Sequence, residues 1–207
     1  MGIVLGTIIL MTTLGATALQ AAELSPPFSL QWGASPSRLV DWAKRSELDL
    51  LVKTPGKDPE LSILLISSEE GSLPQHDATT LEARFLRGKL FEVTVHYTYP
   101  GQTADFVQKR FNELRRVLGL KYGEFKLSAR EKDVKDGIAT TSDAYHLEPS
   151  PGYLLMMSKT EVTDSKRNDI ARRFSVVYHS DHVSRERNET EVFLRENPNA
   201  IRLPERK

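Results

Sequence analysis

The chain contains no cysteine, and this absence excludes several classes of protein at once. Disulfide-stapled domains, enzymes with a Cys–His pair and bacterial lipoproteins anchored through a cysteine all need this residue. In an exported protein, the absence of cysteine fits a bacterial periplasm better than a small eukaryotic secreted domain. We therefore expect a fold that is held together by its core alone.

An excess of charge of either sign is also lacking. Lys plus Arg and Asp plus Glu each number 28, which gives a net charge of zero. Nucleic acids and anionic membranes attract clustered basic surfaces, but basic pairs such as Arg115-Arg116 are interleaved with acids such as Glu113. We expect neither nucleic acid nor an anionic membrane surface as a partner.

Catalytic and cofactor signatures are missing as well. The sequence contains no G-x-S-x-G, S-x-x-K or H-E-x-x-H motif, and its 12 glycines form no phosphate-binding loop. The turn at residues 133–137 lacks the spaced oxygen ligands and the closing glutamate of a calcium loop. We expect no catalytic residue, no metal ligand and no cofactor.

The N-terminal segment, residues 1–22, carries no charged side chain. An apolar run is followed by small residues, the pattern of a signal peptide, and Ala16-Thr17-Ala18 fits the A-x-A cleavage rule; cleavage after Ala21 or Ala22 also fits. The alternative is an uncleaved anchor, since about 20 apolar residues can span a bilayer. We expect a periplasmic or secreted bacterial envelope protein, which meets the membrane only if the leader is retained.

The stretch from residue 88 to residue 123 organises the rest of the chain. Apolar and polar residues alternate over 93–99, which predicts a half-buried strand, and Pro100-Gly101 ends it. Thr103 can then cap a long amphipathic helix whose apolar residues recur at helical spacing. Gly119 or Gly123 can end this helix.

Similar patterns continue on both sides of that stretch. A short helix starts near Ser35, and further strands are predicted at 48–53, 61–66, 81–85, 125–130, 138–146, 153–157 and 174–179. The fold class is α+β, with two helix-plus-antiparallel-sheet modules in the order α-ββββ-α-ββββ. The modules span 23–100 and 101–183, a charged tail follows at 184–207, and the strands form either two small sheets or one curved sheet.

Two short sequence segments resemble segments of known proteins. Phe28-x-x-x-Trp32-Gly33 before a capped helix resembles the start of many uncharacterised bacterial envelope proteins, as does Gly88-Lys-Leu-Phe-x-Val before a helix ending at Tyr122-Gly123. The doubled helix-plus-meander order over 28–180 is similar to the tandem modules of the β-lactamase inhibitor protein family, although the disulfides that such modules often carry are absent. The resemblance implies a scaffold whose open sheet face binds another protein, without implying that the partner is a β-lactamase.

Alternation in the first four strands suggests where a partner binds. One class of positions is fully apolar, while the other is mixed, and a single helix covers only one face of a sheet. We predict a binding surface on the mixed face, formed by Leu64, Ile66, Leu86, Thr94, His96 and Thr98. The alternative is that this face is internal packing, covered by the second half of the chain.

Two functions follow from these patterns. The first is an exported, non-enzymatic binding or adaptor protein that recognises a partner protein through an open sheet face, with self-association through the same patch as a further possibility. The second is a small envelope hydrolase that uses His96, or His179 with His182. His76 and its neighbour Asp77 lie in a polar loop, where we expect them to be solvated.

Overall fold

The computed structural model describes residues 23–56, 59–69, 71–167, 169–186 and 189. The described residues form one open antiparallel sheet of eight strands with helices α1 and α2, in the order α-ββββ-α-ββββ, so the predicted α+β class is confirmed. The elements are α1 (Ser37–Arg45), β1 (Asp49–Lys53), β2 (Leu61–Ser67), β3 (Thr80–Leu86), β4 (Lys89–Thr98), α2 (Ala104–Tyr122), β5 (Lys126–Lys135), β6 (Ile138–Leu147), β7 (Tyr153–Asp164) and β8 (Asp169–Ser180).

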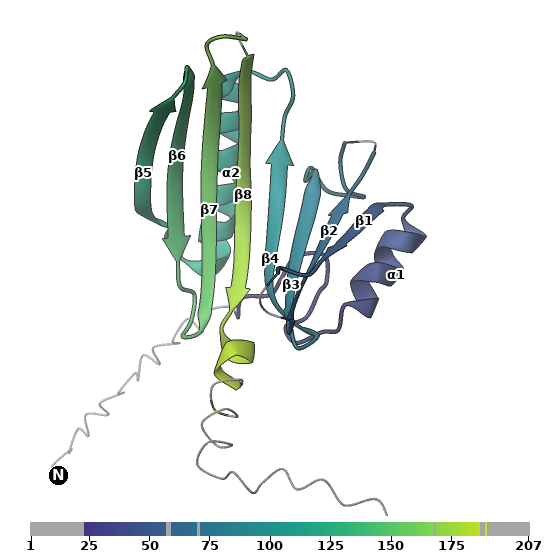
Figure 1. The fold of residues 1–207 in the computed structure, drawn as a ribbon. Helices are drawn as coiled ribbons and strands as arrows, with labels where there is room; N and C mark the ends of the chain where they lie inside the picture. The colour runs from purple at the N-terminus through teal and green to yellow at the C-terminus, as the bar shows by residue number, and fades with distance from the viewer. Residues whose placement is uncertain (1–22, 57–58, 70, 168, 187–188, 190–207) are drawn as a thin grey trace, which may run out of the picture.

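The two four-stranded meanders join into one sheet along β4 and β8. The strand order is β1-β2-β3-β4-β8-β7-β6-β5, so the last strand pairs with the middle of the chain and β5 lies at the far edge (Figure 1). Of the two sheet arrangements left open by the sequence, the single curved sheet is therefore the one observed. The predicted leader and residues 190–207 of the predicted tail lie outside the described residues.

Helix α2 begins and ends where its sequence signals predict. The Thr103 hydroxyl accepts a hydrogen bond from the Phe106 N–H at 3.2 Å, which satisfies one of the free donors of the first turn. Gly123 follows the last turn with φ +119°, a backbone conformation that residues with a Cβ rarely adopt. Among the described residues, no helix is long and apolar enough to cross a membrane.

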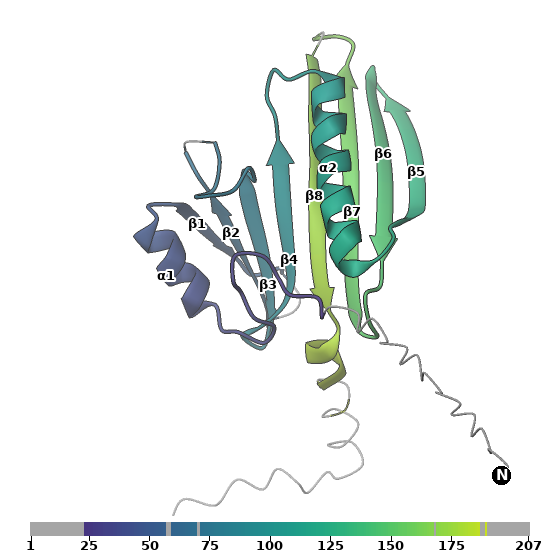
Figure 2. The ribbon, with the colours of Figure 1, turned by 180° about the vertical axis from the view of Figure 1, so that it is seen from behind.

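One face of the sheet, here called the helix side, is covered by four segments. Helix α2 packs over β7 and β8, with Phe111 almost fully buried against Phe174 of β8 (Figure 2). Helix α1, the segment 24–35 and the loop residues 71–79 cover the other half, so that Leu24, Leu39 and Leu73 join the same core. The segment 24–35 is fastened to the start of β4 by paired backbone hydrogen bonds between Gly33 or Ala34 and Leu90, of 2.9 and 3.0 Å.

The register of β2 reverses the predicted assignment of this strand. Leu64 and Ile66 are 2% and 0% exposed and belong to the core on the helix side. The rows across the ladder are Leu64–Ala83–Val93 and Ile66–Leu81–Val95. Directly opposite residues in antiparallel strands share a face, so the prediction that Leu64 and Ile66 lie beside Thr94 on an uncovered surface is wrong.

The remaining alternate residues of β2 lie on the uncovered side of the sheet, here called the open face. Leu65 pairs with Glu82, and Glu82 with Thr94, so Leu61, Ile63 and Leu65 are the apolar residues that share a face with Thr94. All three are half-buried. Figure 1 looks onto this face, and no helix of the described chain covers its strands there. The open face is therefore mixed in character, as predicted, although β2 contributes different residues.

Alanine substitutions on the two faces of β2 should lower the free energy of unfolding by different amounts. Ile66→Ala removes buried methyl groups from the core and should lower the free energy of unfolding by about 2–5 kcal/mol. Leu65→Ala removes a half-buried side chain from the open face and should cost no more than about 1.5 kcal/mol. Urea unfolding of both variants measures the difference, and equal losses would contradict the assigned register.

Candidate functional site

The centre of the open face carries a chain of ion pairs across β3, β4 and β8. Arg84 contacts Glu82 at 2.8 Å and Glu92 at 3.3 Å. The second carboxylate oxygen of Glu92 lies 2.9 Å from His179 Nδ1, and the His179 ring packs edge-on against Phe91. Both carboxylates therefore have partners within the chain, so this part of the face offers paired polar groups.

The predicted binding residues Thr94, His96 and Thr98 lie beside that chain of ion pairs, on the same face. His96 is opposite Thr80 on one side and Ser175 on the other, and the Ser175 hydroxyl bonds the Ser158 hydroxyl at 2.9 Å. Burial lowers the pKa of His96; Glu82 raises it and Arg173 lowers it by smaller amounts. The ring is thus a half-buried, mostly neutral group among hydroxyls.

Leu86, the remaining residue of the predicted surface, pairs with Leu61 and so belongs to the open face by register. It is only 6% exposed and is not part of the main core cluster. The predicted set is therefore divided: Leu64 and Ile66 are core, Leu86 is buried at a strand end, and the three polar residues are half-buried on the open face.

The histidines proposed for a hydrolase do not converge. His179 contacts Glu92, whereas the exposed His182 packs against the Tyr153 ring at 4.8 Å between centroids. None of the hydrogen bonds among the described residues joins the His96 ring to a hydroxyl or a carboxylate, so no nucleophile–base pair is formed there. Within the described part of the chain, no three His, Asp or Glu side chains are grouped as a metal site.

A groove of about 640 Å³ lies on the helix side, between α2 and the loop that precedes β3. Its floor is formed by Tyr97, Tyr99 and Phe174, and an ion pair between Asp77 and Arg110 joins its two walls. Tyr97 and Phe174 are 5% and 2% exposed, because their rings stack on each other at 4.6 Å. The floor is thus the surface of the core.

His76 lies in this groove and is not solvated as predicted. Its Nδ1 accepts a hydrogen bond from the Ala78 N–H at 3.0 Å, and its ring lies 4.9 Å from Phe28 and 5.7 Å from Tyr97. Burial in this aromatic surrounding lowers the pKa of the imidazole, since the charged form is poorly solvated there. Sequence alone gave no signal for this contact, which joins the N-terminal segment, a loop and β4.

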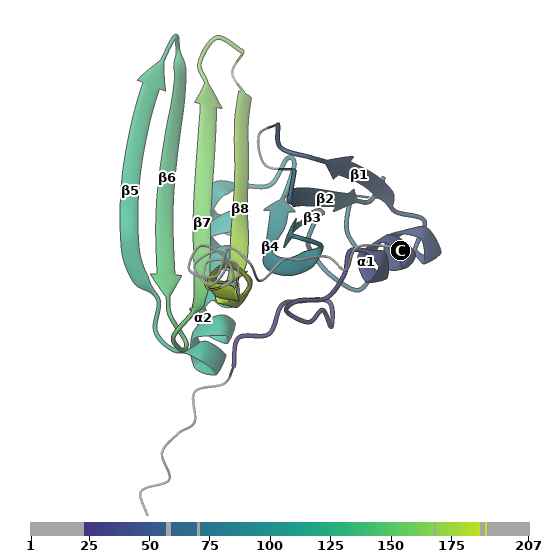
Figure 3. The ribbon, with the colours of Figure 1, turned by 60° about the horizontal axis from the view of Figure 1, so that its bottom comes forward.

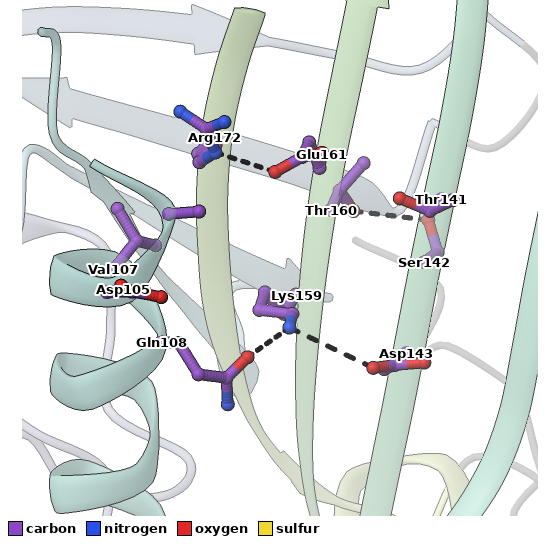
Figure 4. Close-up of a pocket in the computed structure, with 11 residues that line it drawn as sticks. Asp105, Val107, Gln108, Thr141, Ser142, Asp143, Lys159, Thr160, Glu161 and Arg172 are labelled. Atoms are coloured by element: carbon purple, nitrogen blue, oxygen red, sulfur yellow. Dashed lines mark hydrogen bonds and ion pairs between the residues drawn. The ribbon is translucent and has the colours of Figure 1, made fainter. Parts of the chain in front are cut away.

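A smaller polar pocket of about 280 Å³ lies under the first turns of α2 (Figure 4). Lys159 donates a hydrogen bond to Gln108 and lies 3.9 Å from Asp143, while Arg172 Nε donates to Glu161 at 2.6 Å. These pairs continue the apolar rows of β7 and β8 toward the far ends of the strands. The pairs balance each other in charge, and Lys159 links Gln108 to the sheet. We therefore interpret the pocket residues as contacts that hold α2 on the sheet.

No family model, curated protein or solved structure matches this chain. The open face, the groove and the polar pocket are accordingly interpreted from their own geometry. Of the three, only the open face extends over all eight strands and lies clear of both helices (Figures 1 and 2).

The lowered pKa of His76 predicts a pH dependence of stability. The ordinary pKa of histidine is 6.5, so below pH 6.5 His76 of the unfolded chain binds a proton. His76 of the folded chain binds this proton only at a lower pH. The free energy of unfolding should therefore fall as the pH drops from 6.5 toward the folded pKa, and be unaffected by this residue above 6.5. Asparagine at position 76 can keep the acceptor for the Ala78 N–H without titrating.

The measurement compares wild type with His76→Asn by urea unfolding at about pH 7.5 and about pH 5.5. Wild type should lose more stability than the variant on acidification. The same loss in both proteins would show that His76 is not desolvated in the folded state.

Proposed function

We propose that the chain is an exported, non-enzymatic binding or adaptor protein that recognises a partner protein through the open face. The observation that supports this most is the uncovered sheet surface, on which Leu61, Ile63 and Leu65 adjoin a polar centre. Leu51 of β1 extends the apolar part and is 51% exposed. Apolar surface next to paired polar groups is the usual composition of a protein-binding patch.

The partner we infer is apolar with a polar rim and carries little net charge. The carboxylates of Glu82 and Glu92 are already engaged with Arg84 and His179, so a strongly charged partner gains little from them. Thr94 and Thr98 lie on the same surface, where the Thr98 hydroxyl donates to the Thr79 hydroxyl at 3.0 Å and can still accept a hydrogen bond from a partner. Because strands hold these groups in place, little conformational entropy is lost on binding.

Export is part of the proposal and is supported by the sequence of residues 1–22 alone, which lie outside the described residues. The hydrolase alternative has less support, since it needs an activated nucleophile beside a histidine ring. Among the described residues, the Thr79 hydroxyl bonds the backbone carbonyl of His96 and not its ring.

Ile63→Arg tests the open face, with Val117→Arg as a matched control. Ile63 lies within the apolar part, while Val117 is 53% exposed on α2, on the other side of the sheet. A partner isolated with wild-type protein from the cells that make it should bind Ile63→Arg at least about tenfold more weakly, because a buried cation replaces an apolar contact. It should bind Val117→Arg unchanged.

Affinities are measured by titration with the purified partner, and circular dichroism and thermal unfolding establish that both variants remain folded. A partner that binds Ile63→Arg and wild type equally, or that is lost only with Val117→Arg, would place the binding surface elsewhere.

A further inference from the structure

The two edges of the sheet are protected to very different degrees. Six of the ten residues of β5 are charged, the usual means by which an edge strand avoids pairing with another chain. Strand β1, at the opposite edge, reads Asp-Leu-Leu-Val-Lys, and its Leu51 and Val52 are 51% and 58% exposed. An apolar edge strand of this kind is a ready template for another strand.

The outer side of β1 is open to such a strand. Among the described residues β1 pairs only with β2, and α1 lies on the helix side, where its Leu39 and Ala43 join the core (Figure 3). The ion pairs among the described residues do not involve Asp49 or Lys53, the two charged residues of the strand. Both are exposed.

We propose that β1 pairs antiparallel with β1 of a second copy of this chain, with Leu51 opposite Leu51. A two-fold axis perpendicular to the sheet keeps the two faces of the sheet separate, so each residue lies opposite a residue whose side chain is on the same face. The axis must therefore pass through a residue of the strand and not between two residues. Centred on Leu51, the sequence is self-complementary: Asp49 lies opposite Lys53 twice, and Leu50 lies opposite Val52 twice. Opposite charges and apolar pairs at directly opposed positions both stabilise a ladder.

Other symmetric registers are poorer. Centring on Leu50 places Asp49 opposite Leu51, and centring on Val52 places Lys53 opposite Leu51, so both lose the ion pairs. On the β5 edge, centring on Glu131 or Lys132 brings like charges together. Centring on Val134 opposes Asp133 to Lys135 but pairs only three residues of β5, whereas the register centred on Leu51 pairs all five residues of β1. The pattern of charges therefore favours a second copy at β1, in one register.

The pairing joins two eight-stranded sheets into one, with both open faces on the same side. Leu51, Ile63 and Leu65 of the two copies then adjoin across the two-fold axis. This inference rests on the sequence and exposure of β1 alone and does not require the open face to bind a partner.

Charge reversal tests the register. The full chain should have twice the mass of one chain by light scattering and sedimentation, and Asp49→Lys or Lys53→Asp should raise the dissociation constant at least about tenfold, because like charges then face each other twice. The double variant Asp49→Lys/Lys53→Asp restores opposite charges and should recover most of the affinity. Lys132→Glu, on the β5 edge, is the control and should leave the dimer unchanged.

A single introduced cysteine gives an independent readout, since the chain has no other. Directly opposite residues in an antiparallel ladder have Cα atoms about 4.5–5.5 Å apart, which suits a disulfide. Oxidised Leu51→Cys should form a covalent dimer, while Val134→Cys, which is 63% exposed on β5, should not. A wild-type chain that stays monomeric at every concentration, a dimer insensitive to the charge reversals, or crosslinking through Val134 instead of Leu51 would each overturn the proposal.

Discussion

The packing of Phe174 holds the structure together. Its ring stacks on Tyr97 at 4.6 Å and meets Phe111 of α2 at 5.6 Å, so one side chain joins the two central strands and the long helix. β4 and β8 are the seam between the two meanders, and this contact adds side-chain packing to the backbone pairing that joins them into one sheet. It also helps to hold α2 on one side of the sheet, together with α1 and the loops, and no helix of the described residues covers the other side. The binding proposal depends on that asymmetry.

The secondary structure could be predicted because its signals are local. Alternation at a period of two marks the strands, and the Thr103 cap and Gly123 mark the ends of α2. Which residues of β2 point into the core could not be predicted in the same way, because both sets of alternate residues in Leu61-Ser-Ile-Leu-Leu-Ile66 contain apolar side chains. Only its pairing with β3 decides that Leu64 and Ile66 are core, and pairing between strands is a long-range property.

The surface features could likewise be predicted where their signal is local and not where it depends on contacts between distant segments. Thr94, His96 and Thr98 were placed on the open face because their alternation with Val93, Val95 and Tyr97 is unambiguous. The groove around His76 was missed, since it needs Phe28, Tyr97 and α2 to meet a loop that has no periodicity of its own. The polar pocket had a weak signal: Lys159 and Glu161 continue the buried row of Leu155 and Met157, where a charge needs a partner on the covering helix.

The seam between β4 and β8 has a consequence for biosynthesis. Glu92 and His179, which meet across it, are 87 residues apart in the chain. The first meander can collapse as soon as β4 has been made, but the inner edge of β4 then stays unpaired until the last strand is available. Closing so distant a contact slows folding and prolongs the exposure of a strand edge. A chain of this topology therefore remains unfinished, and in need of protection from its neighbours, until nearly all of it has been synthesised.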